Sequence, residues 1–376
     1  MQWYSVILCI LILGLIVTFH EFGHFIVAKA NGIGVTEFMV GLGPVIFEKK
    51  HKGTRYTIRL ILFGGACVMK GDDNGMYTEE EEAAGLEGND EETTGAAFSE
   101  KSVWARIATI FAGPFFNFIL AFILSIVVLG IAGIDKPYVR GIIEGLPAEA
   151  AGLQTDDLIV AVNGHSVKTA RDISLIFGEI DMTQPVTLVV KRDGEKKTFE
   201  ITPVLHTYEV ENEETKETET VTKYMIGFSW NYARTKVGTL ETVAYSLNEV
   251  WYWIKLTVKS LGMMFTGQVT VNDLSGPVGI AEVVNDTVEQ SKQDGLLYIF
   301  LNLINLSVLL SADIGVMNLL PIPALDGGRL MFLFIEAVRG KPIDKKKEGY
   351  VHLAGIIFLL LLMIFVLFND FRKILM

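Results

Sequence analysis

The sequence predicts a polytopic α-helical membrane protein with four transmembrane helices, a membrane-associated β-sheet segment and an inserted compact α+β domain. Three observations predict this class. Half of the 376 residues are hydrophobic. Several apolar runs are long enough to cross a bilayer as helices. Residues 136–203, in contrast, change to short β-type runs, glycine turns and one central helix, as in a small soluble domain.

Ten segments are expected along the chain. In order they are a first membrane helix in 1–32, a membrane-associated β-hairpin in 33–71, an acidic mobile cytoplasmic loop in 72–101, a second membrane helix in 102–134, the inserted domain in 135–205, a hairpin or linker in 206–239, an interfacial amphipathic helix and loop in 240–295, a third membrane helix in 296–328, a basic cytoplasmic loop in 329–350, and a fourth membrane helix with the C-terminal tail in 351–376.

The first helix, expected from about Trp3 to Ala30, contains the sequence His20-Glu21-Phe22-Gly23-His24. Positions i and i+4 share one face of a helix, so both imidazoles can face one metal ion while Glu21 projects beside it. Ionisable side chains in a membrane helix are costly unless they face a polar interior and act there. The motif predicts a zinc-hydrolase centre. The competing interpretation is that these groups only satisfy one another inside a helix bundle.

Residues 33–71 predict a small antiparallel sheet lying against the membrane. Side chains from Tyr56 to Leu62 follow the two-residue period of a strand, and two glycine-containing turns, Gly41 to Pro44 and His51 to Gly53, precede it. Lipid does not tolerate an open sheet edge, so this sheet must line a cavity or be covered by protein. We expect its edge to receive an extended substrate, with Tyr56, Ile58 and Leu60 as binding residues.

Residues 71–100 carry 11 Asp and Glu residues and no Lys or Arg, which accounts for nearly all of the formal net charge of −12. Few of these residues are large and apolar, so we expect a solvated, mobile loop; a specific acidic docking site is the alternative. Charge is about balanced elsewhere. Nothing in the sequence indicates a nucleic-acid partner.

Val103 to Ala132 predicts the second membrane helix, with Gly113-Pro114-Phe115-Phe116-Asn117 near its start. A small residue and a kink there permit close approach to the first helix, with Asn117 as a hydrogen-bond donor to it. A pure packing role explains the motif equally well.

Val243 to Met264 is long enough to span a membrane, but it mixes charged and amide side chains with aromatic ones. That mixture favours an interfacial amphipathic helix over a fifth span. Leu296 to Leu320 predicts the third span, and Pro321 and Pro323 break it shortly before Asp326. A carboxylate after such a break is available as a metal ligand, because the freed backbone requires the polar surroundings of a protein cavity.

Basic residues cluster after the first and third expected spans, and the positive-inside rule puts both clusters in the cytoplasm. The N-terminus, the inserted domain and the C-terminus then lie outside the cell. His20 and Asp326 fall in the cytoplasmic part of the membrane, where they can share one ion. We therefore expect a multi-pass protein of the plasma membrane. His352, at the start of the fourth span, is expected to be interfacial and not a ligand.

Gly145 to Ile159 has the pattern G-L-P-A-x-x-A-G-L-x-x-x-D-x-I and is followed by the turn Asn163-Gly164. These residues resemble a bacterial PDZ domain. The resemblance implies that Tyr138 to Ile143 forms a groove that pairs with a peptide end.

The histidine motif, together with Asn318 to Arg329 (N-L-L-P-I-P-A-L-D-G-G-R), resembles the site-2 proteases, a family of intramembrane zinc metalloproteases. More narrowly, the chain resembles the bacterial regulator-of-sigma-E protease type with one PDZ domain. The G-P-x-x-N motif, the β segment, the PDZ-like domain and Ser275 to Ile280 follow in the expected order. Asp313, however, stands where close relatives are expected to carry an uncharged amide.

The family resemblance implies a set of site residues. It implies Zn²⁺ as the cofactor, and the residues concerned are His20, His24 and Asp326 as zinc ligands, Glu21 as the catalytic acid/base, and Asn318 and Pro323 as substrate-holding residues.

The resemblance also implies a zinc metalloendopeptidase that cuts single-span membrane proteins within or near their transmembrane segments, after their outer domains have been shed. Anti-sigma factors or remnant signal peptides are the implied substrates, and the PDZ-like domain is expected to gate or tether them by peptide ends. One alternative keeps the zinc but makes the substrate soluble or lipidic. Another is a zinc carrier or a membrane scaffold; a carrier needs ligands at several depths, and a scaffold does not need Glu21.

Overall fold

The structure is a computed structural model that describes residues 2–72, 93–211, 218–230, 234–267 and 276–375. It divides into two compact units: unit 1 contains residues 1–127 and 249–376, and unit 2 contains residues 128–248. The acidic loop expected in 72–101 lies largely outside the described residues; near its end, Phe98–Glu100 forms a short 3-10 helix.

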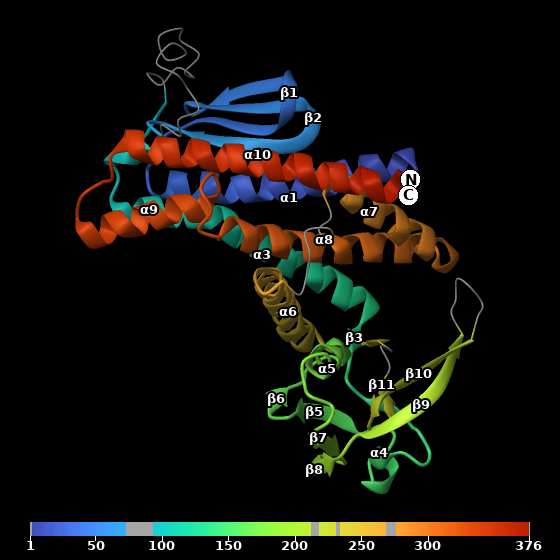
Figure 1. Cartoon of the computed structure of the whole chain (residues 1–376). Coiled ribbons are helices and arrows are strands. Elements are labelled where there is room, and N and C mark those ends of the chain that lie inside the picture. The colour runs from blue at the N-terminus through green and yellow to red at the C-terminus, as the bar shows by residue number, and fades with distance from the viewer. Residues whose placement is uncertain (1, 73–92, 212–217, 231–233, 268–275, 376) are drawn as a thin grey trace. The chain divides into compact units, whose positions relative to one another are not determined.

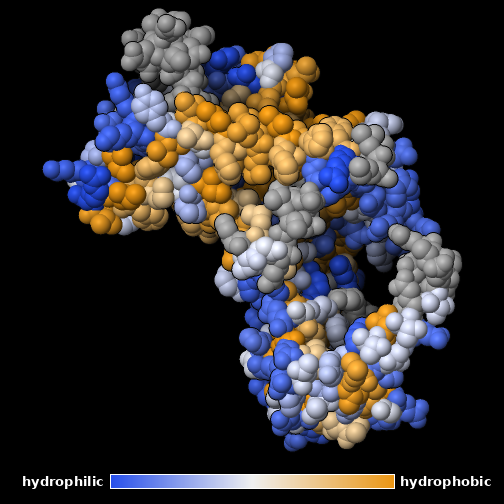
Figure 2. Space-filling model, viewed as in Figure 1, coloured by the Kyte–Doolittle hydropathy of each residue, from blue (hydrophilic) through white to orange (hydrophobic). Residues whose placement is uncertain are grey.

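Four helices in the described part of the chain are long and apolar enough to cross a membrane: α1 (Trp3–Ala30), α3 (Val103–Ala132), α8 (Leu296–Asn318) and the Lys346–Lys373 segment of α10 (Lys345–Leu375). Figure 2 shows apolar side chains over much of the visible surface of α10. The expected number of spans is therefore confirmed, and α6 (Thr239–Phe265) is not among them.

The sheet of unit 1 consists of the antiparallel strands β1 (Val35–His51) and β2 (Thr54–Met69). Both strands bend at glycines with positive φ, Gly41 and Gly43 in β1 and Gly64 in β2, a conformation that glycine adopts without strain. Because of these bends, residues 35–40 pair with 65–69 on one side, and residues 37–40 also pair with 55–58 on the other. Residues 45–51 pair with 54–59. The first half of β1 is therefore central, and residues 65–69 form an outer segment.

Helix α1 packs closely against both the sheet and α3 (Figure 1). A Cβ atom on Gly14 would lie 1.9 Å from the carbonyl oxygen of Leu62 in β2. A Cβ atom on Gly23 would lie 2.4 Å from the carbonyl oxygen of Ala112 in α3. Only glycine permits these two approaches, so α1 is fixed relative to both neighbours.

The expectation of a basic loop in 329–350 is wrong for its first part, because residues up to Arg339 belong to helix α9 (Asp326–Arg339). Leu330 and Leu333 are buried in a core that includes Ile107 and Ile110 of α3. On the same helix, Glu336 accepts hydrogen bonds from the guanidinium of Arg106. The segment is helical because its apolar positions find a partner surface that the charge pattern alone does not reveal.

The expectation of a loop at the end of 240–295 is also wrong, because most of that part is helical. Residues Pro277–Ser291 form helix α7, followed by a 3-10 turn at Lys292–Asp294. Ala281 and Val284 of α7 are buried against the apolar residues of α1 and α8.

Unit 2 is built from short strands and two short helices around one apolar core. Its four-stranded sheet has the order β6-β5-β7-β8, and strands β4 with β11, β3 with β12, and β9 with β10 form separate pairs. The elements are β3 (Ile134–Asp135), β4 (Val139–Ile142), α4 (Pro147–Ala150), β5 (Leu158–Val162), β6 (His165–Ser166), α5 (Ala170–Phe177), β7 (Val186–Arg192), β8 (Glu195–Ile201), β9 (Val204–Glu211), β10 (Thr218–Met225), β11 (Phe228–Trp230) and β12 (Arg234–Thr235). The β-type runs and central helix expected here are present.

Candidate metal centre

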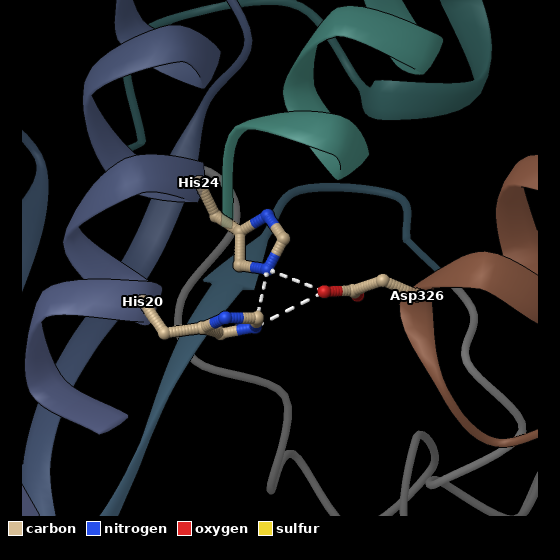
Figure 3. A group of neighbouring side chains, drawn as sticks. All are labelled: His20, His24 and Asp326. Atoms are coloured by element: carbon tan, nitrogen blue, oxygen red, sulfur yellow. Dashed lines mark hydrogen bonds and ion pairs between the residues drawn. The ribbon is translucent and has the colours of Figure 1, made fainter. Parts of the chain in front are cut away.

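Three side chains from the two ends of the chain meet at one point (Figure 3). His20 and His24 are buried on one face of α1, and their Nε2 atoms are 3.2 Å apart. Asp326, the first residue of α9, places Oδ2 3.0 Å from His20 Nε2 and 3.3 Å from His24 Nε2. The three ligand atoms thus form a nearly equilateral triangle.

This triangle fits a zinc ion. Two nitrogen or oxygen ligands about 2.0 Å from zinc at the tetrahedral angle are about 3.3 Å apart. Asp326 Oδ2 is buried and accepts no hydrogen bond from the described residues. A buried carboxylate oxygen without a donor is costly, and a cation facing it removes that cost. Three protein ligands leave a fourth tetrahedral position open, as in catalytic zinc sites.

The His24 ring is oriented by a backbone group of α3. Its Nδ1 lies 2.9 Å from the carbonyl oxygen of Thr109. A carbonyl can only accept, so Nδ1 carries the proton and Nε2 has its lone pair free for a metal. Thr109 could not be found from the sequence, because its contribution is a main-chain oxygen that any residue supplies.

The His20 ring is oriented by Asn117, which also lies on α3. Its Nδ1 is 3.3 Å from the amide group of Asn117, and Asn117 Oδ1 is buried without a partner. Rotating the amide by half a turn exchanges its oxygen and nitrogen. In that orientation Asn117 Oδ1 accepts a hydrogen bond from the His20 Nδ1–H, and both groups have a partner. The expected contact between Asn117 and the first helix is therefore present, with Asn117 acting as acceptor rather than donor when His20 binds through Nε2.

Glu21 lies beside the centre and is not one of its three ligand groups. Its Oε2 accepts a hydrogen bond of 2.8 Å from the backbone N–H of Cys67, in the outer segment of β2. This bond ties the carboxylate to the sheet and leaves Oε1 available for a proton.

Electrostatics in the sheet indicate a neutral thiol beside the centre. Burial, reinforced by the nearby Glu21 carboxylate, raises the pKa of the Cys67 thiol well above its usual value. Cys67 therefore stays protonated.

Gly113 of α3 faces the two imidazoles directly. A Cβ atom there would lie 2.3 Å from His24 Nε2 and 2.8 Å from His20 Nε2. The G-P-x-x-N motif therefore allows α3 to approach the metal-facing side of α1, and any side chain at this glycine would occupy the centre.

The expected substrate-binding residues are spread over two regions. Asn318 ends α8, and Pro323 lies in the turn before α9. Tyr56 and Ile58 pair with β1 residues on both sides, so they are not at an open edge; Leu60 is 62 % exposed. The sheet segment beside Glu21 is instead residues 65–69, which the strand period over 56–62 could not reveal.

Asp313 of α8 has a partner on another helix. Its Oδ1 accepts a short hydrogen bond from the hydroxyl of Thr257 in α6. This contact accounts for a polar side chain at that position but does not bring it into the metal centre.

Residues 8–362 match the model of the family described as Peptidase family M50. The Zinc metalloprotease RasP of Bacillus licheniformis is 34 % identical over 98 % of this chain and 99 % of its own length. The Regulator of sigma-W protease RasP of Bacillus subtilis is 34 % identical over 98 % of both chains. A putative zinc metalloprotease of Clostridium acetobutylicum is 33 % identical, again over 98 % of both chains.

Proposed function

Because the chain belongs to Peptidase family M50, the site-2 proteases, and is a zinc metalloendopeptidase, we propose that it cuts single-span membrane proteins within or near their transmembrane segments. The observation that carries this proposal is the position of the centre. His20, Glu21 and His24 lie on a helix that is long and apolar enough to cross a membrane, and Asp326 directly follows the turn after another. A hydrolytic centre built there meets substrates that are themselves in the membrane.

The chemistry follows from the groups around the centre. His20, His24 and Asp326 would hold a zinc ion, which would supply the lowering of the pKa of a water molecule to about 7 and the polarisation of a carbonyl group. Glu21 acts as the acid/base. With Oε2 held by the Cys67 N–H, its other oxygen takes the proton from the attacking water and returns it to the leaving amine.

A transmembrane substrate must unwind before it is cut, because its carbonyl groups are hydrogen-bonded within its own helix. We propose that the unwound segment pairs with residues 65–69 of β2, which lie beside Glu21. Asn318 and Pro323, close in sequence to Asp326, are proposed to hold the same segment. Tyr56, Ile58 and Leu60 would then contribute side-chain contacts rather than a pairing edge.

The substrate class is proposed from a relative. The name of the Bacillus subtilis protein, Regulator of sigma-W protease, supports a membrane-bound anti-sigma factor, with a remnant signal peptide as the other form of single-span substrate. Either would be cut after its outer domain has been removed, in regulated intramembrane proteolysis.

Unit 2 is proposed to be a PDZ domain on the outer face of the plasma membrane. Its strand β4 pairs with β11 on one side, and the segment Tyr138 to Ile143 is the proposed site for a peptide end. The basic residues after the first and third spans support an active site toward the cytoplasm.

The proposal is tested by cleavage of a model single-span substrate by purified wild-type protein and Glu21→Gln, with zinc content measured in both. Loss of cleavage with zinc retained is expected, because glutamine cannot accept the proton. Equal cleavage by both proteins would overturn the role of Glu21. No zinc in either protein would overturn the metal centre and favour a scaffold.

A further inference from the structure

Ala324 lies two residues before Asp326, in the turn that joins α8 to α9. Its φ is +78°, in the left-handed region that residues with a side chain rarely adopt. The turn makes its own backbone bonds from Ile322 to Leu320 and from Leu325 to Ile322, and neither uses the N–H of Ala324. A strained residue persists only where its surroundings determine its conformation, so a group outside the turn must hold it.

That group is His352 of α10. The Ala324 N–H donates a hydrogen bond of 3.1 Å to His352 Nδ1. Because Nδ1 accepts, the ring proton is on Nε2. The side chain is 14 % exposed, and its ring centroid lies 5.6 Å from that of Phe332 in α9. The imidazole is therefore fixed between α10, α9 and the turn.

A second contact fixes the same face of α10 against the turn. Gly355 lies three residues after His352 and so on the same side of the helix. A Cβ atom on Gly355 would lie 2.4 Å from the carbonyl oxygen of Pro323 and 2.5 Å from its Cβ. Helix α10 thus touches two consecutive residues of the turn, one by close packing and one by a hydrogen bond.

We propose that His352 is a positioning residue for the metal centre. By accepting a hydrogen bond from the Ala324 N–H, it fixes the backbone from which Asp326 would reach a zinc ion. The inference rests on the proposed function, in which Asp326 is a zinc ligand. The Ala324 N–H belongs to the peptide plane shared with Pro323, which Gly355 contacts from the same helix. Ligand groups must be held to within about 0.5 Å, and Asp326 has no donor of its own to fix Oδ2.

The test compares three variants of the full chain in detergent: His352→Leu, His352→Asn and His352→Gln. Asparagine carries Oδ1 on Cγ, where histidine carries Nδ1, and can accept the same hydrogen bond. Glutamine has its oxygen one bond further out and cannot. Zinc affinity is measured by competition with a chromogenic chelator, and folding is followed by thermal unfolding and gel filtration.

We expect His352→Leu and His352→Gln to bind zinc about 10–100-fold more weakly than the wild type, as losses of groups that orient metal ligands do. His352→Asn should restore most of the affinity. Equal affinities for the asparagine and glutamine variants would overturn the inference even if the leucine variant fails to fold, because size and polarity alone would then explain the position.

Asp326→Asn separates this inference from the function on which it rests. If that variant loses zinc while His352→Leu and His352→Gln bind it as tightly as the wild type, only the role of His352 fails. If Asp326→Asn retains zinc at wild-type affinity, the proposed metal centre itself fails.

Discussion

Oε2 of Glu21 and the backbone nitrogen of Cys67 lie 2.8 Å apart and form a hydrogen bond. This bond joins the proposed acid/base on α1 to the outer segment of the sheet, where we propose that the substrate pairs. The carboxylate and the substrate-pairing segment are therefore held in register by one contact, and a small retraction of the carboxylate should be costly.

Glu21→Asp tests this register. Aspartate keeps the charge but is shorter by one methylene, so its carboxylate cannot reach both the Cys67 N–H and the attacking water. We expect kcat for a model single-span substrate to fall about 100-fold or more, the range over which a positioned base acts, with KM and zinc content unchanged. Steady-state cleavage with zinc analysis measures both quantities. A kcat close to that of the wild type would show that the position of the carboxylate is not critical.

Gly113→Ala should empty the metal centre. The added methyl group would lie 2.3 Å from His24 Nε2, closer than any real contact permits, and would displace both imidazoles. Alanine favours helix over glycine, so α3 itself should still form. We expect purified Gly113→Ala to carry no zinc and to cut no substrate, as measured by metal analysis and a cleavage assay.

The matched control for this change is Gly130→Ala in the same helix. A Cβ atom on Gly130 meets nothing within 4 Å, so this variant should bind zinc and cut substrate like the wild type. Equal zinc contents in the two variants would contradict the assigned close approach at Gly113.

The parts of this site that follow a local rule could be predicted from the sequence. Helix periodicity places His20 and His24 on one face, and apolar length gives α1 and α3 their observed bounds. No local rule brings His20 and Asp326 together, because they are far apart in the sequence. Their proximity is predicted instead by the family resemblance and by the depth of both residues in the membrane.

The parts that depend on a distant partner could not be predicted. The segment after Asp326 looks like a basic loop, because the burial of Leu330 and Leu333 depends on the neighbouring face of α3. Which segment of the sheet is outermost depends on where the strands bend. Because of the bends, Tyr56 pairs with Phe38 on one side and Lys49 on the other and is not at an edge. His352 resembles an interfacial histidine until the Ala324 N–H is placed against it.

A pH dependence is expected for unit 2 from the pair Asp157 and Arg192. Two guanidinium nitrogens of Arg192 donate hydrogen bonds of 2.6 Å each to the buried Asp157 carboxylate. The Gln154 N–H donates a third hydrogen bond, of 2.9 Å, to the same carboxylate. Burial alone would raise the pKa of Asp157, but these donors lower it below its usual value. The pair therefore stabilises the folded state above the ordinary Asp pKa of about 3.9, and this contribution is lost as pH falls through the lower folded-state pKa.

Asp157→Asn removes the charge at every pH. We expect unit 2 of this variant to be less stable than the wild type by about 2 kcal/mol at pH 7, with the difference shrinking below pH about 4. Hydrogen exchange of amides in β5 and β7, corrected for the intrinsic pH dependence of exchange, measures the difference. A difference of the same size at pH 7 and pH 3 would mean that the ion pair is not its source.

Removal of most of unit 2, residues 136–233, tests whether this unit gates substrates. Strands β3 and β12 pair antiparallel, with Asp135 opposite Arg234, so the chain enters and leaves the body of unit 2 side by side. Residues 136–233 can therefore be replaced by a two-residue Asn-Gly turn, which closes such a pair without separating its strands. We expect the shortened protein to retain zinc and to cut a single-span substrate that lacks its outer domain.

The decisive measurement is cleavage of the same substrate with its outer domain intact. If unit 2 excludes large outer domains, the wild type resists this substrate and the shortened protein cuts it, while the shortened protein that also carries Glu21→Gln cuts neither form. Resistance that persists after the deletion would refute gating, because the barrier would then belong to unit 1. Loss of cleavage of both forms, with zinc retained, would instead indicate that unit 2 recruits substrates by a peptide end. These outcomes differ because a gate acts by excluded volume, so its removal can only increase access, whereas a tether acts by raising local concentration, so its removal can only lower the rate.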